Sequence, residues 1–183
     1  MTVDWQAMQK GTLRHVLMTD TRDLHEVLDH GIGAFGDAAD YGAFLSGSHA
    51  FRAAIEPQLA RGTGWRIQIL APLIARDLAD LGLPVPTAPS PPPLPTPAAR
   101  AAACYVLEGS ALGGRVLARR AAALGFTAGR GARHLSAQTA SGTRWRQFLD
   151  WLDVGNFPVD QATAAARDVF ALALRAYGVK VPA

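Results

Sequence analysis

The sequence predicts an all-α protein, a single-domain bundle of about six helices over residues 1–183. Three observations support this prediction. Apolar residues recur at spacings of three and four along most of the chain, no segment keeps the period-two alternation of a strand, and no internal repeat is evident. A chain of 183 residues can also bury a sizeable core, as one domain requires.

The first expected helix spans Leu13 to Asp29, where leucines and a valine recur at helical spacing, and Gly31 would end it. The second helix is expected to begin after Asp37, whose side chain can cap its first turn. Its apolar stripe runs from Tyr41 to Leu59.

A shorter third helix is predicted from Leu70 to Leu81, with Gly82 at its end. It leads into the segment "LPVPTAPSPPPLPTP", Leu83 to Pro97, whose proline density forbids a helix and favours an extended chain. We interpret residues 83–97 as a loop within the domain, because the helices on either side would each be too few to form a core alone.

Three further helices are expected in the second half of the chain. The first spans Ala98 to Leu124 and is followed by a glycine-rich connection over residues 125–142. The next begins near Trp145. The last opens at Pro158 and ends at Gly178.

Composition excludes several classes of protein. Hydrophobic residues make up 49% and charged residues 18%, which is typical of a folded globular protein. The net charge of +3 comes from scattered basic residues without an aromatic platform, so nucleic-acid binding is not expected. The single cysteine, Cys104, excludes an internal disulfide and a cysteine zinc cluster, and no apolar run is long enough for a membrane span. We therefore expect a cytoplasmic protein.

Residues 31–36, "GIGAFG", match the G-x-G-x-x-G pattern of dinucleotide-binding loops. That pattern binds a pyrophosphate only when it follows a strand, and here it follows a predicted helix. We interpret the segment as a loop between two helices, whose glycines supply positive φ angles.

The stretch "YVLEGSALGGRVLARR", Tyr105 to Arg120, has helical character although it contains three glycines. Each glycine in a helix interior costs about 1 kcal/mol relative to alanine. Two readings explain them. Gly109 and Gly113 lie on one face and, with Gly114, could let another helix approach closely, or they could bare the backbone toward a flat ligand.

His25 lies in "TDTRDLHEVLD", four residues after Thr21 and four before Asp29, so the three side chains share one face of the first helix. A histidine beside Leu24 and Leu28 is commonly a packed or solvent-tipped side chain. The alternative is an axial ligand of haem iron, because neutral imidazole binds iron and leaves the opposite side of the porphyrin free for oxygen.

Together these segments resemble the bacterial haem oxygenases, especially the branch associated with bacterial phytochromes. The resemblance rests on "YVLEGSALGGRVLAR" and the upstream "TRDLHEVLD", and it extends over nearly the whole chain through "DYGAFLSGSHAFRAAIEPQL", "LIARDLADLG", "RWRQFLDWL" and "ARDVFALAL". It implies a haem oxygenase-like bundle in which haem lies between a proximal helix carrying the iron ligand His25 and a distal helix bent at Gly109, Gly113 and Gly114.

The resemblance also implies the reaction. Members of the family use O2 and electrons to open haem to biliverdin, carbon monoxide and ferrous iron, so haem is both substrate and cofactor. Electrons would come from a ferredoxin or a reductase, and a bacterial phytochrome could receive the biliverdin. The binding residues expected on this basis are Thr21, Arg22 and His25 on the first helix, with Arg144 and Arg146 as further contacts for the haem propionates.

One departure from the family concerns the distal helix. Many members have an aspartate directly after the first distal glycine, where it organises water for proton delivery, and this chain has Ser110. A hydroxyl can hold water but carries no negative charge. Two alternatives therefore remain open: a non-catalytic haem or bilin carrier on the same fold, and a thiol hydrolase that uses Cys104 as nucleophile.

Overall fold

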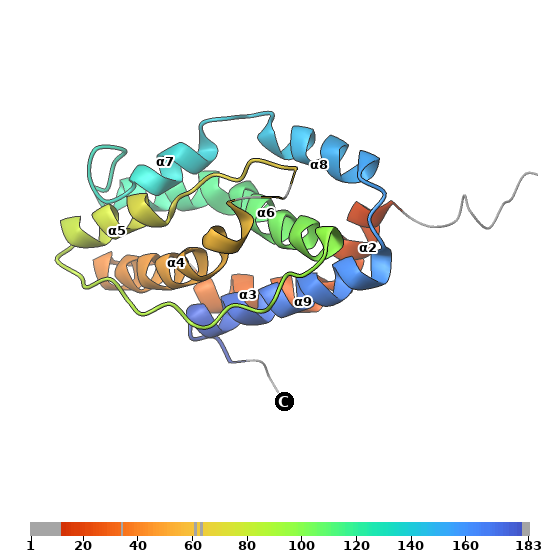
Figure 1. Ribbon diagram of the computed structural model, residues 1–183. Helices are drawn as coiled ribbons and strands as arrows, with labels where there is room; N and C mark the ends of the chain where they lie inside the picture. Colours follow the sequence, from red (N-terminus) through yellow and green to blue (C-terminus); the bar gives the residue numbers. More distant parts are fainter. Residues whose placement is uncertain (1–11, 34, 61, 63, 181–183) are drawn as a thin grey trace, which may run out of the picture.

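The protein is described by a computed structural model, which covers residues 12–33, 35–60, 62 and 64–180. These residues form helices joined by loops, with no β-strand among them, so the predicted all-α class is confirmed (Figure 1). The structure has eight helices in this part of the chain, where about six were expected: α2 (Leu13–Asp20), α3 (Arg22–Ile32), α4 (Ala38–Leu59), α5 (Ala71–Asp80), α6 (Pro97–Ala123), α7 (Arg133–Thr139), α8 (Arg144–Val154) and α9 (Val159–Ala176).

One of the additional helices arises because the expected first helix is two, α2 and α3, separated at Thr21. The Thr21 hydroxyl donates to the carbonyl of Leu17 at 2.7 Å, a back-bond of the kind that bends helices. The end of α3 also differs from the expectation. The helix continues through Gly31 to Ile32, and Gly33, with φ +62°, is the residue at which the chain leaves it.

The other additional helix is α7, which lies inside the connection expected to be irregular. Asp77 of α5 is fully buried, and its carboxylate stabilises the first turn of α7. It accepts hydrogen bonds from the backbone N–H groups of Arg133 and His134, each at 3.0 Å. Nδ1 of His134 lies 2.8 Å from the same carboxylate. Burial by itself would raise the pKa of Asp77, but the hydrogen bonds from His134 and from these backbone groups outweigh it and lower that pKa. The carboxylate is therefore a fixed anion that joins α5 to α7.

Several predicted boundaries agree with the structure. The Asp37 carboxylate accepts the backbone N–H of Asp40 at 2.8 Å and so caps α4 as expected. Residues 83–95 are extended and return along α4 and α9 to the start of α6 (Figure 1). This proline-rich loop is attached to the bundle, because Leu94 is buried and the Gln58 amide donates to the carbonyl of Pro92 at 3.0 Å.

The largest helix interface joins α6, which crosses the middle of the molecule in Figure 1, and α9, which runs below it. Both helices meet through small side chains, including Ala102 and Ala103 on α6 and Ala162 and Ala166 on α9, all buried. Small residues let helix axes approach closely. The interface thus places the N-terminal half of α6 in the core and leaves its later turns nearer the surface.

A second cluster of buried residues fills the space between α4, α5 and α7, around Tyr41, Phe44, Ile74 and Leu135. The Tyr41 hydroxyl donates to the carbonyl of Gly131 at 2.6 Å, which fixes the loop before α7.

No helix in the described ranges combines the length and the apolar character needed to cross a lipid bilayer.

Candidate functional site

His25 lies on α3 with its imidazole largely accessible, since its side chain is 57% exposed. Nδ1 of the ring is 3.2 Å from Oδ2 of Asp29, one turn further along the helix, and the ring meets the edge of Phe170 on α9 at a centroid distance of 6.1 Å. A carboxylate beside Nδ1 favours the tautomer in which that nitrogen carries the proton. Nε2 is then the nitrogen available to a ligand.

The neighbours of His25 differ in what they can offer. Arg22 is exposed one turn before the histidine. Thr21 is buried, and its hydroxyl proton is directed to the carbonyl of Leu17. Asp23, on the outer side of α3, forms a two-point ion pair with Arg167 of α9 at 3.1 and 3.0 Å, which holds α3 against α9.

The three glycines of α6 have different surroundings. A Cβ on Gly114 would come within 3.0 Å of Cγ2 of Thr139, so this glycine allows α7 to pack closely. A Cβ on Gly109 would make an ordinary contact of 3.8 Å with Trp145. A Cβ on Gly113 would meet no atom of the described residues within 4 Å. Helix packing therefore explains Gly114 but leaves Gly113 without a structural reason.

Gly113 is flanked on the surface of α6 by two unusually exposed apolar side chains. Leu112 is 61% and Val116 is 40% exposed, and with Gly113 they form what we term the open face of α6. Exposed apolar groups gathered around a bare backbone are typical of a surface that contacts an apolar ligand or partner.

A contact between Arg120 and Gly33 ties this side of α6 to the end of α3. The Arg120 guanidinium donates to the carbonyl of Gly33 at 3.1 Å. Gly113 lies two helical turns before Arg120 on the same side of α6, and His25 lies about two turns before Gly33 on α3. The two predicted site positions are therefore at similar distances, on the order of 10–12 Å along their helices, from the contact that joins them.

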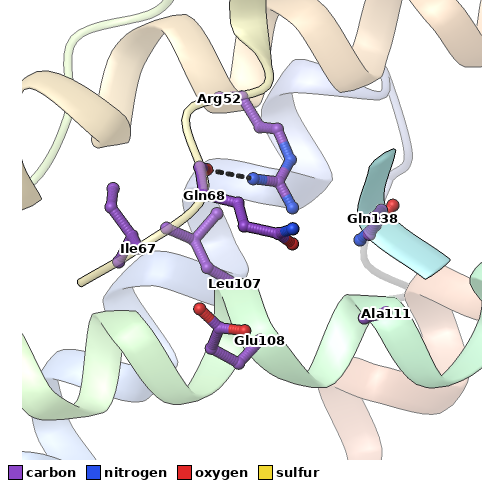
Figure 2. Close-up of a pocket in the computed structure, with 7 residues that line it drawn as sticks. All are labelled: Arg52, Ile67, Gln68, Leu107, Glu108, Ala111 and Gln138. Atoms are coloured by element: carbon purple, nitrogen blue, oxygen red, sulfur yellow. Dashed lines mark hydrogen bonds between the residues drawn. The ribbon is translucent and has the colours of Figure 1, made fainter. Parts of the chain in front are cut away.

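Ser110 lies beside the open face, and its hydroxyl takes part in a compact polar cluster. It donates to the carbonyl of Leu107 at 2.6 Å. It is 3.3 Å from Nη2 of Arg52 on α4 and 2.9 Å from the side-chain amide of Gln138 on α7. The residues of three helices thus meet at Ser110, and Figure 2 shows Arg52 and Gln138 around the small cavity that they line with α6.

Arg52 is almost fully buried and is paired with Glu56, one turn further along α4, at 3.0 Å. Glu56 also accepts the backbone N–H groups of Leu70 and Ala71 at 2.9 and 3.1 Å, and so caps the start of α5. Sequence reasoning missed Arg52, because its partner Ser110 is 58 residues away in the chain.

The predicted propionate contacts on α8 are separated by the structure. Arg144 forms a two-point ion pair with the buried Glu108 of α6, with Nε to Oε2 at 2.7 Å, and its guanidinium lies 5.1 Å from the ring centre of Trp65. Arg146 is exposed on α8. The guanidinium of Arg144 is thus already engaged by a protein carboxylate, whereas that of Arg146 is accessible.

Cys104 is fully buried on α6, in the core formed with α9. Burial raises the pKa of its thiol to about 12, and the nearby Glu108 carboxylate acts in the same direction. A protonated, inaccessible thiol is a poor nucleophile. The geometry gives no support to the hydrolase alternative.

The described residues fit haem. An imidazole with one nitrogen beside a carboxylate and the other free is the donor that haem iron takes from a protein. The open face of α6 offers apolar side chains and a backbone position at Gly113 that no atom of the described residues fills. The fit rests on His25 with Asp29 on one helix and on Gly113 with its neighbours on the other.

Comparisons with known proteins point the same way. No family model matches the chain. A protein named haem oxygenase from Xanthomonas campestris pv. campestris (strain 8004) is 39% identical over 89 residues, which are 45% of this chain and 53% of that protein. The chain thus spans about half the length of this curated relative.

A solved structure is similar over almost its full length. It belongs to a crystallographic study of the NO- and CO-bound haem oxygenase from Neisseria meningitidis, and it matches with a TM-score of 0.75, 24% sequence identity, and coverage of 94% of this chain and 95% of that one. The fold is therefore that of a bacterial haem oxygenase. The resemblance to bacterial haem oxygenases is thus supported by sequence over 45% of the chain and by fold over 94% of it, and the phytochrome-associated branch stays a prediction.

Proposed function

We propose that this protein is a haem oxygenase, which uses O2 and electrons to convert haem to biliverdin, carbon monoxide and ferrous iron. The observation that carries the proposal is the pairing of His25 and Asp29 on α3, in a bundle whose α6 presents the unfilled position at Gly113 and is tied to α3 by Arg120. Similarity to haem oxygenases in sequence and fold supports it.

His25 is proposed as the proximal ligand through Nε2. Asp29 would hold the proton on Nδ1, which fixes the ring orientation and makes Nε2 a stronger donor. Phe170 of α9 lies against the ring on one side, at a centroid distance of 6.1 Å. When bound, haem supplies the iron that binds oxygen and the macrocycle that is opened.

The open face of α6 is proposed as the distal surface. Gly113, with Gly109 one turn before it, would let the helix backbone approach the ligand, while Leu112 and Val116 would exclude water from the apolar part of the site. Gly114 contributes indirectly, because it lets α7 bring Gln138 to Ser110.

The proposed reaction also calls for side chains that bind the haem propionates, an electron donor and a recipient of the product. Haem carries two propionates, for which the exposed Arg22 and Arg146 are proposed as contacts. Arg144 could serve only in competition with Glu108. The reaction requires a ferredoxin or reductase as electron donor, and a bacterial phytochrome in the cytoplasm is the proposed recipient of biliverdin.

The test is a titration of the purified protein with haemin, followed by reduction. We expect a Soret band that saturates at one haemin per chain. With ascorbate or a ferredoxin system, and with catalase present, this band should decay while biliverdin absorbance grows. A Soret band that persists without ring opening would favour the carrier alternative.

Two histidine variants make the test specific to the site. His25→Ala should remove the axial ligation, whereas His30→Ala, an exposed position later on the same helix, should retain it. Absence of any Soret change in the wild-type protein, or equal spectra for the two variants, would refute the proposal.

A further inference from the structure

The polar cluster at Ser110 has an unusual distribution of hydrogen-bond donors. A serine hydroxyl has one proton, and here that proton faces protein acceptors: the carbonyl of Leu107 at 2.6 Å, or the Gln138 amide at 2.9 Å when its oxygen is turned inward. Ser110 therefore has no proton to donate toward the open face of α6. The donor-rich group of the cluster is the guanidinium of Arg52.

Arg52 is fixed in place although it is buried. Nη1 donates to Oε1 of Glu56 at 3.0 Å and to the carbonyl of Gln68 at 3.4 Å, the second of which is drawn in Figure 2. Nη2 faces Ser110 at 3.3 Å. Both terminal nitrogens of the guanidinium thus have a set direction, and the one that points toward α6 is Nη2.

The carboxylate of Glu56 has other hydrogen-bond partners besides Arg52. Its two oxygens also accept the backbone N–H groups of Leu70 and Ala71, at the positive end of the α5 dipole. The negative charge of Glu56 is shared between Arg52 and the start of α5, which lies on the side of Arg52 away from Ser110. The other carboxylate of this region, Glu108 of α6, is paired with Arg144, and the group that Nη2 of Arg52 faces on α6 is the neutral Ser110.

A cavity beside the guanidinium extends this arrangement. It is lined by Arg52, Gln68, Glu108 and Gln138 together with apolar groups, and its volume of about 10 Å³ is at the lower limit of the space that can hold one water molecule. Its polar lining can satisfy such a water. The cluster is thus a rigid, polar unit directly behind Ser110.

We propose that Arg52 is a positioning residue for the distal side of the haem site: its guanidinium orients Ser110 and Gln138 and places a fixed positive charge behind the α6 surface where an anionic ligand of the haem iron would lie. This inference rests on the proposed function. It assigns to α4 a part in a site otherwise made by α3 and α6.

The test compares two variants that differ only at position 52. Glu56→Gln keeps the cation, and the double variant Arg52→Gln/Glu56→Gln removes it without leaving a buried unpaired carboxylate. The measured quantity is the Kd of azide, an anion, for the ferric haem complex, with neutral imidazole as the comparison ligand. Arg76→Gln, at an exposed position on α5, serves as a surface control.

We expect azide to bind roughly tenfold more weakly to the double variant than to Glu56→Gln, if one charge acts over a distance taken as about 10 Å with an effective dielectric constant of about 20. Imidazole should bind both variants alike, and Arg52→Lys/Glu56→Gln, which retains the charge, should recover most of the azide affinity. Arg76→Gln should match the wild-type protein.

Each contrary result has a distinct meaning. Equal azide affinities for Glu56→Gln and the double variant would overturn the role of Arg52 while leaving the haem site in place. Equal losses for azide and imidazole would also overturn it, because they would indicate a general distortion of the pocket. A wild-type protein without a Soret band would overturn the proposed function and this inference together.

Discussion

Replacing Gly113 with alanine separates the stability of α6 from its proposed function. The position is helical and exposed, and an added Cβ would meet no described atom within 4 Å. Alanine should therefore stabilise the protein without ligand by about 1 kcal/mol, the difference in helix propensity. In a chain of this length that gain corresponds to about 2–4 °C in Tm.

The same methyl group should harm haem binding. If Gly113 lets the backbone approach the porphyrin, the methyl occupies space that the ligand needs, and an overpacking cost of about 1–3 kcal/mol predicts a haemin affinity about 5- to 150-fold weaker. Urea unfolding of the apoprotein and a Soret titration of the same preparation measure the two effects. Opposite signs of the two changes are the expected result.

Gly114→Ala is the matched control one residue along the helix. Its Cβ would lie 3.0 Å from Thr139, whose hydroxyl donates to the carbonyl of Leu135 at 2.7 Å and so resists movement. This variant should be less stable than Gly113→Ala. A Gly113→Ala protein that is destabilised would refute the open-space argument, and one that is stabilised with unchanged haemin affinity would refute the proposed role of Gly113.

Three further changes test other parts of the structure. Asp29→Asn should weaken haemin affinity about 10- to 100-fold, because the second nitrogen of His25 loses its carboxylate; an unchanged Soret titration would contradict this. Asp77→Asn should lower the free energy of unfolding at pH 7 by about 2–3 kcal/mol. Folding lowers the pKa of Asp77, so the stability that its carboxylate contributes is present above the unfolded pKa near 3.9 and is lost as the pH falls toward the folded value. The free energies of unfolding in urea of wild type and variant should therefore converge in acid. A constant difference down to pH 2 would show that the charge of Asp77 is not the source of the stability. Cys104 should react with iodoacetamide in urea but not in the native protein, because it is buried and its pKa is raised to about 12; rapid native labelling would contradict its placement.

Features of the site that depend on local sequence could be predicted, and features that depend on long-range packing could not. The cap at Asp37 and the position of Asp29 one turn after His25 follow from spacing along one helix. The helix α7 was missed because its first turn is stabilised by Asp77, which is 56 and 57 residues away in the chain. Arg144 was expected to face the haem propionates, and its pairing with Glu108 depends on how α8 lies against α6.

The different surroundings of the three glycines of α6 also result from packing. All three lie within six residues of one helix, and sequence alone offered two readings for the whole group. In the structure the members differ, since Gly114 faces α7, as close helix packing requires, whereas a Cβ on Gly113 would meet no described atom within 4 Å. Which residue faces which neighbour is set by the rotation of α6 against α9, and the extensive alanine interface between those helices fixes that rotation.

Ser110 and Arg52 are best understood as a pair, which leads to a last prediction. Many haem oxygenases have an aspartate where this chain has Ser110, and a carboxylate there would lie within ion-pair distance of Nη2 of Arg52, given the present separation of 3.3 Å from the serine oxygen. Ser110→Asp should therefore add a negative charge beside the cation and lower the azide affinity of the ferric complex by roughly tenfold relative to the wild-type protein. The rate of biliverdin formation, measured in parallel, would show whether a carboxylate held by Arg52 can assist proton delivery. An azide affinity equal to that of the wild-type protein would mean that the charge of Arg52 does not reach the ligand, and the positioning role argued from Ser110 would then be wrong.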